Sequence, residues 1–457
     1  MKKTIFNYIT LSAVVLSLGL TSCEKDINEV NRINPNQFSD SDPTLMITGA
    51  QMANVLVQEG EMARIAGIFS GYFSGSDRQY VSLSQYICNA GDFDNVWGTV
   101  YSEGIGQCRL IKSKAEKANN KVLYGVASIT EAHLLLTAAS VWGDIPNTEA
   151  CDDSKENPKF DDMNSVYQYC IDLLTKVEPD LVGKSSYSTA YAGTFDWSEV
   201  ANTLLARAYL HKKDYTNAKA AALKGVSAGN DLYADHSQAS PGAWNLYYDF
   251  LDWNRPGYMS CVGAHIVGLL DTASKTTCRN NAKTDETGRF GYYFVKDYYT
   301  SCDPNMVDGI FATTQNFALV TYAETQLILA ECESRLNNDA QALVHLNNVR
   351  AELNTKYGTY SDYVLSDFGP GKMLAGATQS EALLKEIMME KYVSMYGQIE
   401  GWTDIRRTNN LIGVPANTGS DLPQRFLIPQ SEINANSNAK GANSGSKPLM
   451  QKLPMFQ

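Results

Sequence analysis

The feature that most constrains the fold is a pair of amphipathic helical segments between Ser198 and Val226. Large apolar, small and aromatic side chains recur there at helical spacing, on both sides of a polar turn. The positions are Leu205, Ala206, Tyr209 and Ala218, and the turn is Lys213-Asp214-Tyr215. This order is typical of a tetratricopeptide unit, in which two antiparallel helices pack through small residues. The segment therefore predicts a helical hairpin.

A second segment of the same character runs from Phe317 to Leu353. Each half places apolar side chains on one helical face. They are Leu329, Cys332 and Leu336, then Ala342, Leu343, Leu346 and Val349. Units of this kind cannot bury their apolar faces alone, so they stack side by side. We therefore expect an all-α scaffold of tetratricopeptide-like helix pairs, with weaker members of the array near residues 124–178.

Further helices are expected where apolar residues recur at spacings of three and four. These segments are 45–68, 96–108, 124–141, 163–178 and 198–210. Trp97 shares a helical face with Tyr101 and Ile105. Trp142 and Trp402 each lie beside a glycine at a helix end. We expect all three tryptophans to be structural.

Residues 230–316 differ from these helical segments in composition. They are rich in Gly, Asn, Asp and aromatic residues, with one short helical pattern at about 261–270. We expect an irregular, loop-rich insertion set against the helical scaffold. Residues 70–89 form a second loop candidate, and residues 409–457 are polar and glycine-bearing without repeats.

The N-terminus has the pattern of a secretory signal of the lipoprotein type. Two lysines precede a short apolar run, and the small residue Ser22 precedes Cys23. Such a signal is cleaved before the cysteine, which is then acylated. A plain cleaved signal with an incidental cysteine is the alternative. We expect a signal peptide over 1–22, a lipidated tether over 23–43 and a single domain over 44–457.

The charge of the chain argues against nucleic acid as a partner. The whole sequence carries a net charge of -12, and cleavage of residues 1–22 removes Lys2 and Lys3, so that -12 - 2 gives -14. An acidic surface offers no general attraction for a phosphate backbone. We expect no binding of nucleic acid.

Signatures of metal, nucleotide and esterase chemistry are missing from the sequence. The five histidines never form an HExxH spacing, and no CxxC pair, GxxxxGK[ST] loop or GxSxG elbow occurs. We therefore expect no metal site and no cofactor. Eight cysteines remain besides Cys23, and the sequence leaves open whether they form disulfides or stay as thiols.

Two carboxylates, Glu324 and Glu331, raise the possibility of glycoside hydrolysis. Such chemistry needs a pair of acids from facing segments about 5–9 Å apart. Both residues lie within ordinary helix-pair patterns, where solvated helix faces are the usual outcome. We therefore expect no enzymatic activity.

Aromatic and polar side chains alternate within one irregular stretch of the insertion. The aromatic residues are Trp244, Tyr247, Tyr248, Trp253 and Tyr258, and the polar ones are Asn245, Asp249, Asp252, Asn254 and Arg255. Sugar rings have apolar faces bordered by hydroxyl groups, so they suit flat aromatic side chains flanked by hydrogen-bonding groups. An exposed aromatic surface usually indicates recognition.

We therefore predict that this stretch binds the ligand. The predicted site consists of Trp244, Tyr247, Trp253, Asn254, Arg255 and Tyr258, with Tyr80 from the earlier loop. Tyr72 and Arg78 could join Tyr80 in a second wall. The alternative is that these aromatic residues pack the insertion onto the scaffold.

Several segments together resemble the SusD/RagB family of surface lipoproteins from Bacteroidetes. They are Trp97-Gly98-Thr99-Val100-Tyr101, Trp142-Gly143-Asp144-Ile145-Pro146, Tyr322-Ala323-Glu324 with Ala330-Glu331, Glu390-Lys391-Tyr392, Gly401-Trp402-Thr403-Asp404-Ile405-Arg406-Arg407, and Phe426-Leu427-Ile428-Pro429-Gln430. They occur in the family's order and are more similar to its shorter branch than to its starch-binding founder.

The resemblance implies an all-α fold around four tetratricopeptide-like helix pairs and a non-catalytic role in nutrient capture. It implies a lipid-anchored protein on the surface of the outer membrane, which delivers oligosaccharides to a SusC-like TonB-dependent transporter. Some family members bind peptides, so a peptide ligand is one alternative. A helical scaffold for envelope proteins, without a small ligand, is another.

Overall fold

A computed structural model of the chain describes residues 41–274, 276–296 and 301–457. The expected signal peptide and Cys23 lie outside these residues. The chain divides into two units, Met1–Leu45 and Met46–Gln457. The second unit contains the fold that follows.

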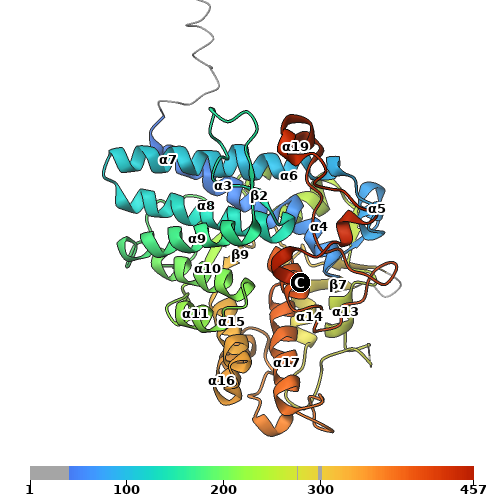
Figure 1. Cartoon of the computed structure of the whole chain (residues 1–457). Coiled ribbons are helices and arrows are strands. Elements are labelled where there is room, and N and C mark those ends of the chain that lie inside the picture. Colours follow the sequence, from blue (N-terminus) through green and yellow to red (C-terminus); the bar gives the residue numbers. More distant parts are fainter. Residues whose placement is uncertain (1–40, 275, 297–300) are drawn as a thin grey trace, which may run out of the picture. The chain divides into compact units, whose positions relative to one another are not determined.

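The scaffold is a succession of helices that pack on one another in chain order, with α15 following α11 (Figure 1). Its members are α7 (Gly106–Lys117), α8 (Lys121–Trp142), α9 (Met163–Val177), α10 (Trp197–His211), α11 (Tyr215–Ala222), α15 (Tyr322–Arg335) and α16 (Asp339–Tyr357). Both predicted hairpins are present, as α10 with α11 and α15 with α16. The C-terminal helices α17 (Gln379–Ser394) and α18 (Ile399–Arg407) follow, and α17 packs against α15. The all-α, helix-pair prediction is confirmed.

Three predicted helical segments differ in detail, and the loop predicted over 70–89 contains the short helix α5 (Arg78–Ser84). The helix expected over 45–68 is divided into α3 (Pro43–Glu59) and α4 (Glu61–Phe69). Gly60 lies at the break, where a Cβ atom would stand 2.2 Å from the Leu56 carbonyl oxygen. The helix expected over 96–108 consists of α6 (Asp94–Gly98), the π-helical turn η2 (Thr99–Ile105) and the start of α7.

The third difference concerns the start of the second helix pair. Residues Phe317–Val320 form strand β9 before α15 begins. This strand is an edge of a three-stranded antiparallel sheet of order β4-β5-β9, with β4 at Tyr191–Ala192 and β5 at Leu232–Ala234. Ala234 pairs with Phe317, and Leu232 pairs with Val320.

The insertion and the flanking loops contain short elements. The paired strands are β1 (Ser74–Gly75) with β6 (Met259–Ser260), β2 (Ile145–Pro146) with β3 (Phe160–Asp161), and β7 (Phe294–Lys296) with β8 (Cys302–Pro304). The short helices are α5 (Arg78–Ser84), α12 (Leu246–Tyr248), the π-helical η5 (Asp249–Asn254), α13 (His265–Leu270), α14 (Thr287–Tyr293) and α19 (Gln430–Ala435). Single 3-10 turns are η1 (Ala90–Phe93), η3 (Glu178–Asp180), η4 (Pro241–Ala243), η6 (Leu365–Asp367), η7 (Ser437–Ala439), η8 (Pro448–Met450) and η9 (Pro454–Phe456).

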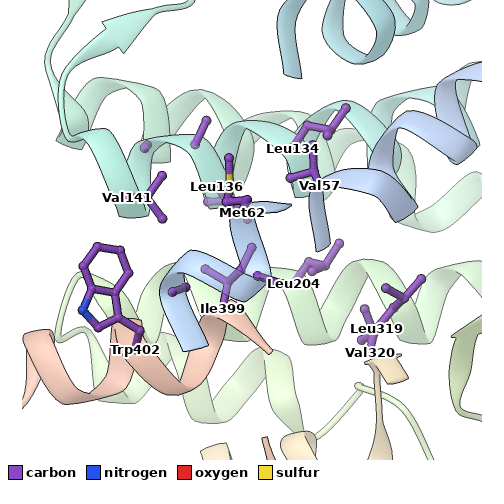
Figure 2. Close-up of a cluster of buried hydrophobic side chains, with 14 of the residues drawn as sticks. Val57, Met62, Leu134, Leu136, Val141, Leu204, Leu319, Val320, Ile399 and Trp402 are labelled. Atoms are coloured by element: carbon purple, nitrogen blue, oxygen red, sulfur yellow. The ribbon is translucent and has the colours of Figure 1, made fainter. Parts of the chain in front are cut away.

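The core lies where α3, α4, α8, α10, β9 and α18 meet (Figure 2). Val57, Leu134, Leu204, Val320 and Trp402 come from different elements and are all buried there. Trp97 and Trp142 are buried as well, so all three tryptophans expected to be structural are confirmed as such.

Helix α8 passes through the middle of this core. Of the helices that the structure describes, it is the one long and apolar enough to cross a membrane. However, 89% of its most apolar window is buried inside the protein. Its composition is therefore accounted for by packing, since a helix that is apolar all round belongs in the centre of a large fold. The eight cysteines of the described chain are free thiols.

Candidate ligand-binding site

A cleft of about 390 Å³ lies between helices α3 and α4 and the part of the insertion that follows residue 245. Its walls combine aliphatic, aromatic, charged and amide side chains. The lining residues are Leu56, Val57, Gly60, Glu61, Arg64, Asn95, Val96, Thr99, Leu246, Asp249, Phe250, Asn254 and Arg255. Charged and amide groups next to apolar and aromatic surface can bind a ligand that carries both hydroxyl groups and apolar faces.

Two π-helical turns border the cleft. Asp249, Phe250 and Asn254 belong to η5, and Thr99 is the first residue of η2. A π-helical turn is rare and frequently occurs at a functional site, because its wider backbone changes the direction of neighbouring side chains. Asn245 starts this segment by accepting hydrogen bonds from the backbone N–H groups of Tyr247 and Tyr248.

Arg64 is a cleft residue that the sequence interpretation missed. Its guanidinium lies 3.9 Å from the centroid of the Phe250 ring, and its Nε donates a hydrogen bond to the Tyr80 hydroxyl over 3.2 Å. The cation–π contact and the hydrogen bond together fix the guanidinium. An arginine within the otherwise apolar run of α4 was the signal that could have identified it.

A carboxyl group adjoins this arginine. Burial raises the pKa of Glu61, and the charge of Arg64 and a hydrogen bond with Asn95 offset part of that rise. Glu61 also occupies the first turn of α4, where the helix dipole favours an anion. The cleft can therefore offer both a donor and an acceptor to a ligand that carries hydroxyl groups.

The structure places two predicted site residues, Asn254 and Arg255, on the rim of the cleft. Both are exposed. The Asn254 amide donates to the Asp249 carboxylate over 2.6 Å, and the Arg255 Nη1 donates to the Asn254 carbonyl oxygen over 2.7 Å. These bonds connect the rim residues to one another and leave other donors of Arg255 available.

The half-buried Trp244 and the exposed Trp253 form an aromatic surface just outside the cleft lining. Their ring centroids are 5.6 Å apart at an interplanar angle of 86°. The ring of Tyr248 also packs edge-on against Trp244, with the two ring centroids 5.5 Å apart. Trp253 is 62% exposed, which is unusual for so large an apolar side chain. We call Trp244, Tyr248 and Trp253 the tryptophan platform.

Tyr258 connects the loop at residues 70–89 to the insertion. Strand β1 pairs with β6, and the N–H groups of Ser76 and Asp77 both donate to the Tyr258 carbonyl oxygen. The half-buried Tyr258 ring lies 6.0 Å from the guanidinium groups of Arg78 and of Arg255. The loop and the insertion, which are far apart in sequence, therefore meet beside the cleft.

Tyr247, Tyr80 and Tyr72 require a correction. All three are buried, with at most 2% of each side chain exposed. The Tyr247 ring stacks on Phe311 with centroids 4.2 Å apart, and its hydroxyl donates to the Gly397 carbonyl oxygen. These rings have no free face for a sugar, so for them the packing alternative is correct.

Glu59 anchors the start of the aromatic segment. Its carboxylate accepts a hydrogen bond from the Leu246 N–H over 2.8 Å and pairs with the His236 Nε2 over 2.8 Å. Burial opposes the charged form of His236, but the hydrogen bond and charge of Glu59 outweigh it, so the pKa of His236 is raised. The segment is therefore tied directly to the C-terminal end of α3.

The two carboxylates considered for hydrolysis are engaged in buried ion pairs. Glu324 accepts hydrogen bonds from Arg207 over 2.7 and 2.8 Å, and Glu331 is bound by Arg407. Neither faces the cleft. Within the ranges that the structure describes, no three His, Cys, Asp or Glu side chains are grouped as metal ligands.

Comparisons with known proteins agree with this architecture. A model for SusD-like proteins, described as "Starch-binding associating with outer membrane", matches residues 35–429. No curated protein matches the chain. A solved SusD/RagB family protein from Bacteroides thetaiotaomicron is 18% identical, with a TM-score of 0.69 over 91% of this chain and 99% of that one.

Two further solved structures are similar. A SusD homolog from Bacteroides uniformis is 15% identical, with a TM-score of 0.67 over 91% of this chain and 100% of that one. A chitin-binding SusD homolog from Flavobacterium johnsoniae is 14% identical, with a TM-score of 0.67 over 90% of this chain and 98% of that one. At such identities the likeness concerns the fold.

Proposed function

Because this chain belongs to the SusD-like (SusD/RagB) family, we propose that it binds oligosaccharides and delivers them to a SusC-like TonB-dependent transporter of the outer membrane. The family model is described as starch-binding and as associating with the outer membrane. A structural neighbour of this chain is named as chitin-binding. The proposed role is capture and delivery, without catalysis.

The observation that carries this proposal is the exposure of Trp253 beside Trp244 at the edge of a polar cleft. Leaving a tryptophan ring in water forgoes about 1.5–3 kcal/mol of burial free energy, so such a surface usually marks a binding site. Trp253 and Trp244 would contact the apolar faces of sugar rings. Asn254, Arg255 and Arg64 would hydrogen-bond to their hydroxyl groups.

Tyr258 and the cleft carboxyl Glu61 complete the proposed site. The guanidinium groups of Arg78 and Arg255 each lie 6.0 Å from the Tyr258 ring centroid, so we assign Tyr258 a supporting role beside the rim arginine. The acidic net charge of the chain, -12, favours neutral over anionic oligosaccharides.

Titration of the purified full-length protein with a panel of ligands tests the ligand class. The panel contains chito-oligosaccharides, malto-oligosaccharides, uronic-acid oligosaccharides and short peptides, and calorimetry measures the affinity. We expect a neutral oligosaccharide to bind and the uronic-acid series to bind more weakly. Binding of peptides alone would replace the glycan proposal with the peptide alternative. Absence of any ligand, together with co-purification of a transporter, would favour the scaffold alternative.

The anchor is a separate part of the proposal. We propose that Cys23 carries the lipid and that residues 23–43 tether the domain to the outer surface of the membrane. Cys23→Ala should leave the oligosaccharide affinity unchanged and abolish retention on the cell surface, measured by protease accessibility on intact cells. Retention of the variant on the surface would contradict the lipid anchor.

A further inference from the structure

A second cavity, of about 580 Å³, lies between helices α14 and α16, the C-terminal end of α17, and the side of the sheet formed by β5 and β9. It shares no lining residue with the proposed oligosaccharide cleft. Three half-buried tyrosines, Tyr233, Tyr292 and Tyr357, contribute to its walls. The cavity is larger than the cleft, and the proposed function assigns nothing to it.

Helix α16 supplies two oppositely charged side chains to this cavity, Glu352 and Lys356. They are one helical turn apart, a spacing at which a glutamate and a lysine commonly pair. Lys356 instead places its Nζ 4.1 Å from the centroid of Tyr292 and 5.2 Å from that of Tyr357. In the part of the chain that the structure describes, no hydrogen bond or ion pair to Glu352 is formed.

The other charges around the cavity are already compensated or negative. Asp231 accepts hydrogen bonds from the Tyr233 hydroxyl and from the Tyr322 N–H, each over 2.7 Å. Arg289 pairs with Glu390 over 2.7 Å. With Arg289 neutralised in this way, Asp231 and the ionised form of Glu352 outnumber Lys356, so the cavity carries an excess negative charge whenever Glu352 is ionised.

We propose that this cavity binds a small ligand through a primary ammonium group, which Glu352 receives beside the tyrosine rings. An ammonium group supplies the missing donor for Glu352 and balances the excess charge of the cavity. The Tyr292 and Tyr357 faces already hold the Lys356 ammonium, so the attraction for the ligand comes from the Glu352 carboxylate. An anionic ligand would meet Asp231 and Glu352 and is therefore disfavoured.

The protonation of Glu352 provides an independent signal of such binding. Burial, with a further contribution from the charge of Asp231, raises the pKa of Glu352 to about 7. At pH 7 the carboxyl group is thus partly protonated in the free protein. An ammonium ligand favours the ionised form, so binding should release a fraction of a proton.

Amino sugars and peptide N-termini both present a primary ammonium group, and the experiment separates them. The full-length protein is titrated at pH 7 with glucosamine and with alanyl-alanine amide, each beside its N-acetyl derivative. We expect at least one ammonium compound to bind at least tenfold more tightly than its N-acetyl form. Binding of glucosamine alone would indicate an amino sugar, and binding of the dipeptide amide alone would indicate a peptide end.

The variant Glu352→Gln keeps the shape of the side chain and removes its charge. It should weaken binding at least tenfold and abolish the proton release, which is measured by repeating the calorimetry in buffers of different ionisation enthalpy. Glu156→Gln, the same change at an exposed loop position, is the matched control and should bind like the unmodified protein. Thermal unfolding of both variants checks that they fold.

Three results would overturn the proposal. They are failure of both ammonium compounds to bind, equal binding of the N-acetyl forms, and unaltered binding by Glu352→Gln. Trp253→Ala should leave ammonium binding unchanged, because Trp253 is not part of this cavity. Failure of the ammonium proposal can therefore be distinguished from failure of the oligosaccharide proposal.

Discussion

Arg407 holds the carboxylate of Glu331 with both of its terminal nitrogens, across 76 residues of sequence. Its Nη1 donates to Oε1 over 2.8 Å and its Nη2 donates to Oε2. Its Nε donates to Asp404 over 2.6 Å. All three side chains are buried. Since Glu331 lies on α15 and Arg407 on α18, the ion pair joins the C-terminal helices to the helix-pair scaffold.

Removing Arg407 should strongly destabilise the protein. Arg407→Ala would leave the buried Glu331 with only Arg335, at 3.6 Å, and the buried Asp404 with only Lys391, at 3.0 Å. The expected cost is about 3–5 kcal/mol in the free energy of unfolding. Urea unfolding monitored by circular dichroism measures the change. Arg78→Ala, at an exposed arginine, is the control and should change the free energy by less than about 0.5 kcal/mol. A loss below about 1 kcal/mol for Arg407→Ala would show that the pair is not a structural link.

The glycine that precedes Trp402 is expected to be required for close packing. A Cβ atom at Gly401 would stand 2.0 Å from the Tyr72 hydroxyl oxygen, which donates a hydrogen bond to the Tyr392 carbonyl oxygen. Gly401→Ala should therefore destabilise the fold by about 1–3 kcal/mol or more. Gly98→Ala is the matched control, because nothing lies within 4 Å of its Cβ position. Equal melting temperatures for the two variants would contradict the packing argument.

His265 should make the protein sensitive to mild acid. Burial lowers its pKa to about 4, whereas an unfolded histidine titrates near 6.5. The folded state therefore binds this proton less readily than the unfolded state does. As a result, the free energy of unfolding falls as the pH drops from about 6.5 towards 4. By pH 5 the loss is about 1–2 kcal/mol. His265→Gln should lose less stability than the unmodified protein between pH 7.5 and 5, and parallel unfolding curves for the two proteins would contradict this.

Much of the scaffold could be predicted because its signals are local. The small and aromatic positions of α10 and α11 indicated a hairpin without knowledge of its neighbours. In contrast, Phe317–Val320 lay within an apolar run that was assigned to a helix. Its strand partner β5 is remote in sequence, and a short apolar run does not distinguish a buried strand from a helix.

The sequence indicated a stretch that borders the candidate cleft, but it did not distinguish the exposed aromatic residues of that stretch from the buried ones. Tyr247 and Trp253 have the same local surroundings of aromatic and polar residues. What separates them is Phe311 and Gly397, which cover Tyr247 and come from other parts of the chain. Arg64 was missed for the same reason, because its role depends on contact with Phe250 across the cleft.

Substitution of the buried Tyr247 should lower the stability of the fold and leave oligosaccharide binding unchanged. Tyr247→Phe removes the hydroxyl that donates to the Gly397 carbonyl oxygen over 2.6 Å, which costs about 1 kcal/mol in the free energy of unfolding. Its affinity for the oligosaccharide selected from the panel should equal that of the unmodified protein. A tenfold loss of affinity in a variant that remains folded would show that Tyr247 contributes to ligand binding.

The affinity of Trp253→Ala for the same oligosaccharide tests the central claim most directly. The ring is 62% exposed, so its removal should change the melting temperature little. We predict that the affinity falls at least tenfold, about 1.4 kcal/mol, while Tyr247→Phe retains full affinity. Unchanged affinity in Trp253→Ala would contradict the claim that the tryptophan platform binds the sugar.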